Sequence, residues 1–209
     1  MREKRGLGKR MWLIGNNKRF TMIEMAIVLI IIGIIIGAVI KGKDFVRSGE
    51  QKKLYSTFLN AWDMAFNSYY DRTGRILGDA RTNNNTGTRD GHCSDPSETN
   101  LNNQLRNVGL EPPAVGATGS TTERTYKDSE GRMAPIEVEF DYHANVGNYI
   151  EIGEIPNDLG LAWDRIIDGV IDGRAGNFFY VTSTSTMTTS DWPSATVAPV
   201  KGSAAILNL

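Results

Sequence analysis

Residues 20–40 read FTMIEMAIVLIIIGIIIGAVI, and Glu24 is the only charged side chain among these twenty-one residues. At about 1.5 Å per residue, a helix of this length measures roughly 30 Å, the thickness of the bilayer hydrocarbon. Residues 1–19 contain seven Lys or Arg against one Glu. The positive-inside rule therefore places the N-terminus in the cytoplasm and the chain after about residue 44 outside.

A cleaved secretory signal peptide would have a shorter apolar region, followed by two small residues that flank the cleavage site. Here the apolar run is longer, and Ala38 is followed by Ile40 and Lys41. A plain signal anchor remains the simplest alternative interpretation.

Glu24 lies near the start of this apolar helix, where an unpaired carboxylate costs several kcal/mol and marks a functional position by default. We expect its own segment to offer it no partner. Residues 18–29 read KRFTMIEMAIVL, and this segment resembles the prepilin-peptidase recognition segment of type IV pilins and type II secretion pseudopilins. In that family a short basic leader is cut just before a Phe, and a Glu stands fifth in the mature chain. Phe20 and Glu24 match these positions, whereas Arg19 replaces the small residue, usually Gly, that the family places before the cut.

The resemblance implies a precursor in the bacterial inner membrane, cleaved by prepilin peptidase between Arg19 and Phe20 and methylated at the Phe20 amine. It further implies that inner-membrane assembly machinery polymerises the chain into a helical homo-oligomer, an extracytoplasmic filament. Glu24 would then pair with the Phe20 ammonium of a neighbouring subunit. Adhesion, motility, DNA uptake and secretion all remain open as roles. The alternative is a monomeric, signal-anchored extracytoplasmic binding protein.

One long helix is expected from residue 20 to about residue 70, because this stretch lacks proline and Gly74 is a natural helix stop. The second half of this helix carries an apolar stripe at three- and four-residue spacing. Its members are Phe45, Leu54, Phe58, Ala61, Trp62, Ala65 and Tyr69. Glycines 33, 37 and 42 indicate either close helix packing or a place where the helix can unwind.

We expect an α+β fold, a pilin-like roll in which three or four antiparallel strands pack on the outer half of the helix. The predicted domains are a basic leader (1–19), the long helix (20–74, with 20–40 in the membrane or filament core) and a globular domain (75–209). Polar residues 79–133 are expected to form a long exposed loop with a weak helix at 101–108. Alternating or apolar runs predict strands at 136–142, 149–152 and 177–181, a helix at 158–168 and an edge strand at 204–209.

Charge and composition make several functions unlikely. After the leader, the chain carries 16 basic and 23 acidic residues, a poor balance for binding nucleic acid. Cys93 is the only cysteine, so an intrachain disulfide is impossible, and His92–Cys93 offers too few ligands for structural zinc. No catalytic triad or phosphate loop is recognisable, and we expect no enzymatic activity.

Asp164, Asp168 and Asp172 lie among turn glycines, and such closely spaced carboxylates could bind calcium. The ion would stabilise a domain that has no disulfide. The alternative is an ordinary solvated Asp-Gly turn.

Overall fold

The structure is a computed structural model that describes residues 20–79, 89–93, 97–200 and 203–209. It divides into two compact units, Met1–Phe45 and Val46–Leu209. The described part of the first unit consists of Phe20, Thr21 and the beginning of the long helix. The predicted leader, residues 1–19, lies outside the described residues.

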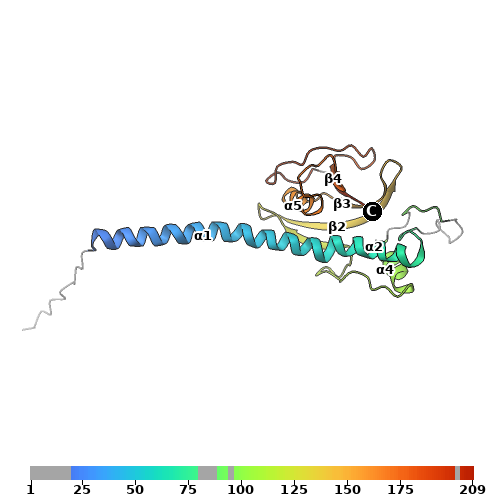
Figure 1. The fold of residues 1–209 in the computed structure, drawn as a ribbon, viewed down its shortest axis with the longest axis horizontal. Helices are drawn as coiled ribbons and strands as arrows, with labels where there is room; N and C mark the ends of the chain where they lie inside the picture. Colours follow the sequence, from blue (N-terminus) through green and yellow to red (C-terminus); the bar gives the residue numbers. More distant parts are fainter. Residues whose placement is uncertain (1–19, 80–88, 94–96, 201–202) are drawn as a thin grey trace, which may run out of the picture. The chain divides into compact units, whose positions relative to one another are not determined.

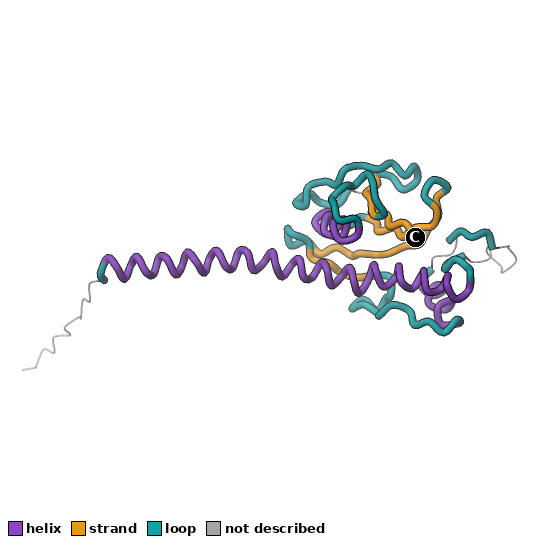
Figure 2. Tube along the Cα trace, in the orientation of Figure 1, coloured by secondary structure: helices purple, strands orange, loops and turns teal. Residues whose placement is uncertain are grey.

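The predicted long helix is confirmed, and it runs without a break over Met22–Thr73 (Figure 2). It consists of α1 (Met22–Leu54), the π-helical turn η1 (Tyr55–Leu59) and α2 (Asn60–Thr73). Gly74 ends it in the left-handed conformation, with φ 64°, and its N–H donates to the carbonyl of Tyr70 at 2.7 Å. Glycine adopts this φ without steric strain, which explains why the helix stops there.

The π turn places two consecutive apolar side chains, Phe58 and Leu59, in the core, where both are fully buried. The hydroxyls of Ser56 and Thr57 donate to the carbonyl of Lys53 at 3.1 and 2.8 Å. The carbonyl of Lys53, which lies just before the π-helical turn, therefore accepts two side-chain hydrogen bonds.

The second unit contains one antiparallel sheet with the strand order β1-β2-β3-β5-β4. Strands β2, β3 and β4 are labelled in Figure 1. Its strands are β1 (Glu123–Lys127), β2 (Met133–His143), β3 (Gly147–Gly153), β4 (Phe178–Val181) and β5 (Ala204–Asn208). The inner face packs on the helix, where the ring of Phe140 lies 5.4 Å from Trp62 and 5.9 Å from Phe66, centroid to centroid. The expected α+β fold, a long helix on a small antiparallel sheet, is therefore confirmed.

Helix α5 (Asn157–Ile167) packs beside the long helix and buries Leu159 and Trp163 completely. The indole of Trp163 donates to the carbonyl of Gln51 at 3.1 Å, and its ring lies 6.4 Å from that of Phe178 on β4. This single side chain thus joins the long helix, α5 and the sheet.

The stretch expected as an exposed insertion, 79–133, contributes to the core. Helix α4 (Glu98–Asn107) buries Leu101 and Leu105 completely, and β1 inserts Tyr126. Strand β1 was not predicted because ERTYK is mostly polar and only Tyr126 is buried within it. The sheet consequently has five strands instead of three or four.

The expectation of an edge strand at the C-terminus is also wrong. Strand β5 pairs with β3 on one side and with β4 on the other. Residues 204–207 are all buried. Their continuous apolar character is typical of a strand covered on both faces.

Candidate functional site

The first candidate site is the apolar part of α1, which the subunit leaves uncovered. The helix is long and apolar enough to cross a membrane, and none of its most apolar stretch is buried within the subunit. More than a dozen large apolar side chains between residues 20 and 40 are exposed, including Ile23 (68%), Leu29 (70%) and Ile34 (67%). A folded chain does not leave such a surface in water, so lipid or other protein must cover it.

Thr21 and Glu24 form a capping box at the start of this helix. The Glu24 Oε2 atom accepts hydrogen bonds from the Thr21 backbone N–H at 2.7 Å and from the Thr21 hydroxyl at 2.8 Å. The Thr21 Oγ1 atom in turn accepts the Glu24 N–H at 3.2 Å. The expectation that Glu24 has no partner in its own segment is therefore wrong. The signal that would have revealed this is the Thr-x-x-Glu spacing ahead of an apolar run, a capping-box signature.

These hydrogen bonds leave part of the Glu24 carboxylate available. Both donors reach Oε2, and within the part of the chain that the structure describes Oε1 accepts no hydrogen bond. A hydroxyl and an amide also stabilise the charge without neutralising it. Phe20 is the first described residue and is 73% exposed, whereas Arg19 lies outside the described residues. The geometry of the predicted cleavage site is therefore not described.

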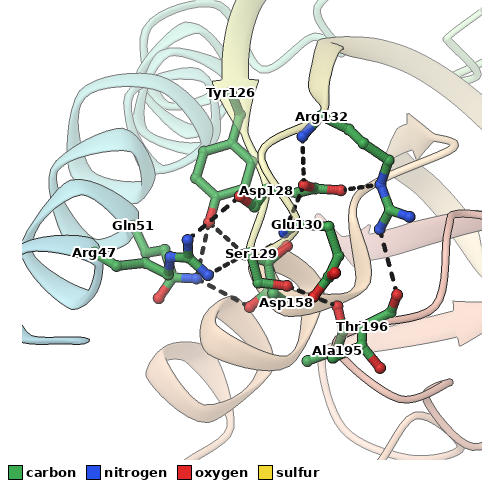
Figure 3. Close-up of polar contacts among 10 residues, drawn as sticks. All are labelled: Arg47, Gln51, Tyr126, Asp128, Ser129, Glu130, Arg132, Asp158, Ala195 and Thr196. Carbon is green, nitrogen blue, oxygen red and sulfur yellow. Dashed lines mark hydrogen bonds and ion pairs between the residues drawn. The ribbon is translucent and has the colours of Figure 1, made fainter. Parts of the chain in front are cut away.

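A buried polar network anchors the C-terminal part of α1 within the second unit (Figure 3). The amide of Gln51 donates to the Tyr126 hydroxyl at 3.0 Å and to the Asp158 carbonyl at 3.1 Å. The Tyr126 hydroxyl donates to Asp158 Oδ2 at 2.7 Å, and Arg47 Nη1 lies 4.0 Å from the same oxygen. Helix α1, strand β1 and helix α5 are thereby joined by side chains that sequence reasoning did not single out.

Burial raises the pKa of the Asp158 carboxyl, although the Tyr126 hydroxyl and Arg47 act to lower it. Burial, together with the hydrogen bond to Asp158, also raises the pKa of the Tyr126 hydroxyl. Asp158 Oδ1 is buried and accepts no hydrogen bond from the described residues. The network fixes the C-terminal part of α1 in place.

A second polar contact in Figure 3 holds the turn between β1 and β2. The Arg132 guanidinium pairs with Asp128 at 2.6 Å, and the backbone N–H groups of Glu130 and Arg132 donate to the same carboxylate at 2.9 and 2.8 Å. The Ser129 hydroxyl donates to the carbonyl of Ala195 at 3.2 Å. The turn is therefore fastened to the segment that precedes β5.

The three aspartates proposed as calcium ligands each accept backbone N–H groups. Asp164 Oδ2 accepts the Asp172 N–H at 2.9 Å and the Trp192 indole N–H at 2.6 Å, and Asp164 is fully buried. The two oxygens of Asp168 accept the N–H groups of Asn177 and Phe178, both at 2.9 Å. These carboxylates brace the turn that leads into β4.

The structure does not gather these aspartates into a ligand set. Among the described residues, no group of three or more His, Cys, Asp or Glu side chains is arranged to hold a metal ion. His92, considered for zinc, instead stacks on Tyr142 with 3.4 Å between ring centroids. Calcium binding stays an untested prediction. The hydrogen bonds that these carboxylates accept give a structural reason for aspartates in this turn even without an ion.

In comparisons with known proteins, no family model, curated protein or solved structure matches this chain.

Proposed function

We propose that this chain is a structural subunit of a type IV pilus or pilus-like filament, with no catalytic activity of its own. The observation that carries the proposal is the uncovered apolar helix that starts with the Thr21–Glu24 pair. The sequence around it, residues 18–29, supplies the resemblance to prepilins. The precursor resides in the bacterial inner membrane with a cytoplasmic N-terminus, and the mature subunit lies in an extracytoplasmic filament.

Burial energetics support two successive environments for the helix. Covering one large aliphatic side chain contributes about 1.5–3 kcal/mol, and more than a dozen are exposed along residues 20–40. Lipid covers them in the precursor. Once the subunit has left the bilayer, the same helix of other copies offers an equally long apolar surface, so polymerisation replaces the cover that lipid provided.

Cleavage between Arg19 and Phe20 supports assembly in two ways. It removes seven basic side chains, each of which costs about 2.5–3.5 kcal/mol at the centre of a membrane. It also creates an ammonium group at Phe20. Such a group on a neighbouring copy can pair with Glu24, whose Oε1 atom has no donor in the described residues.

The monomeric signal-anchored binding protein stays as the second candidate, and the capping box favours it. A carboxylate that receives two hydrogen bonds from Thr21 has a helix-starting role even in a single copy. Under this alternative the charge of Glu24 is dispensable, because glutamine caps a helix in the same way.

A matched pair of substitutions separates charge from capping. Glu24→Gln keeps a capping residue and removes the charge, whereas Thr21→Val removes the hydroxyl that the box requires and keeps the charge. If the filament proposal holds, the Gln variant inserts in the membrane but yields no filaments in electron micrographs of sheared surface material. The Val variant weakens the helix start by about 1 kcal/mol and still assembles. If both variants insert normally in the membrane and the wild type itself forms no filaments, the signal-anchored alternative is favoured.

A further inference from the structure

The outer face of the sheet has a buried, apolar half and a more exposed, acidic half. Over β3, β5 and β4 this face is apolar, with Tyr149, Phe179 and Ile206 buried in a cluster against which Met187 packs. Over β1, β2 and β3 it carries five carboxylates, of which three are exposed and two are half-buried. We call this half the acidic face; it comprises Glu123, Glu137, Glu139, Asp141 and Glu151.

The strand register places carboxylates of the acidic face directly opposite one another. Glu123 pairs with Glu137 across β1 and β2, and Glu139 pairs with Glu151 across β2 and β3. Like charges at directly opposed positions destabilise a sheet. Among the outward positions of these three strands, one residue is Lys or Arg, namely Lys127. It pairs with Met133 and lies at the other end of β1 from Glu123. At the described outward positions of these three strands, no basic side chain therefore lies opposite these glutamates.

A hollow of about 470 Å³ lies on the acidic face. Glu137, Glu139 and Glu151 line it together with the apolar side chains of Met133 and Pro135. Carboxylates beside apolar side chains suit lysine, whose methylene stem packs on apolar surface while its ammonium group reaches an anion.

The same chain carries a matching basic surface, which we call the basic segment. It covers residues 41–53 of α1 and contains five Lys or Arg against two acidic residues. Lys41, Lys43, Lys52 and Lys53 are exposed, and in the described part of the chain none of them forms an ion pair. Arg47 differs, since it already contacts Asp158 and the carbonyl of Asp128.

We propose that the acidic face of one subunit docks on the basic segment of a second copy. The charges are complementary: five carboxylates gather on the acidic face, and five Lys or Arg lie on the basic segment. The two surfaces lie on different parts of the chain, so the contact is heterologous, and repeated heterologous contacts generate an open helical filament when the rotation between copies does not close a ring. The inference rests on the proposed function and adds a second, polar contact to the apolar one between helices.

A zero-length carbodiimide, which joins a lysine amine to a carboxylate, tests this contact in the full-length chain. Filaments and membranes would be prepared from a mixture of ¹⁴N- and ¹⁵N-labelled chains, so that mass spectrometry distinguishes links between copies. We expect mixed-isotope links between Lys52 or Lys53 and the acidic face, with a yield that falls several-fold from 50 to 500 mM salt. Links from these lysines to other carboxylates only, or no links between copies, overturn the proposal.

Charge reversal supplies an independent arm. Glu139→Lys with Glu151→Lys, and separately Lys52→Glu with Lys53→Glu, should each lower filament yield at least tenfold, and mixing or combining both pairs should restore it. A control pair, Asp71→Lys with Glu111→Lys, changes net charge equally at two exposed positions outside the acidic face and the basic segment. Folded variants that assemble like the wild type, or a combined variant that is not rescued, contradict the docking contact. If carbodiimide joins two copies in membranes but no filaments form, the docking contact stands and the filament proposal is refuted.

Discussion

Glu151 on the acidic face combines partial burial with repulsion by neighbouring carboxylates. Burial, followed by the nearby charges of Glu139 and Asp141, raises its pKa from 4.5 to about 7. In a fully buried group this difference corresponds to about 3 kcal/mol. Glu151 is partly exposed, and we expect screening by water to reduce the value to about 1 kcal/mol.

The sign follows from proton linkage. Because the folded-state pKa lies above the unfolded one, the folded state binds the proton more tightly, so stability is greatest below pH 4.5 and is lost as the pH rises to about 7. Glu151→Gln stays neutral throughout. We therefore expect the variant to gain about 1 kcal/mol over the wild type at pH 8, a rise in Tm of about 2–4 °C for a domain of this size, and to show little difference at pH 4.5.

Thermal unfolding of the full-length chain in detergent, followed by near-ultraviolet circular dichroism between pH 4.5 and 8, measures this difference. Glu139→Gln removes the opposing charge and should move the transition of Glu151 to lower pH. Glu111→Gln, an exposed change elsewhere, serves as the control. A Glu151→Gln variant with the same pH dependence as the wild type would refute the reasoning.

Three further outcomes are expected from the same unfolding assay. Gly160→Ala places a methyl group against the ring of Trp192 and should cost about 1–3 kcal/mol by overpacking, whereas Gly153→Ala meets nothing within 4 Å and should leave packing unchanged. Tyr126→Phe removes the donor to a buried carboxylate and should cost about 1–3 kcal/mol; an unchanged Tm would show that the network does not anchor the helix. If calcium binds at Asp164, Asp168 and Asp172, a chelator should lower Tm, because an ion bound to the folded state stabilises it; an unchanged Tm would show that the hydrogen bonds to these carboxylates hold the turn without an ion.

Periodicity predicted most of the fold because the main elements bury one regular face. The outer half of the helix, β2 and β3 follow from apolar side chains at helical or alternating spacing, and β4 follows from a short continuous apolar run. Strand β1 does not, since its place in the sheet depends on pairing with β2 and only Tyr126 among its five residues is buried. The position of β5 between β3 and β4 depends on long-range pairing that its own residues do not encode.

The candidate sites were likewise predictable from the sequence only where their signal is local. Phe20 and Glu24 were recognisable from a local pattern, and the capping role of Thr21 was readable from the same residues. The acidic face was not, because alternating glutamates along β2 are typical of any solvated strand. Only the register that places Glu139 opposite Glu151 shows that the charges are concentrated.

The central claim is that this chain is the processed subunit of a filament, and mass analysis of the filament itself tests it most directly. Sheared surface material would be imaged by electron microscopy, and its main subunit analysed by intact mass and N-terminal peptide sequencing. We expect filaments built from a chain that begins at N-methyl-Phe20. A chain that stays in the membrane fraction, retains residues 1–19 and is missing from any filament would contradict the account.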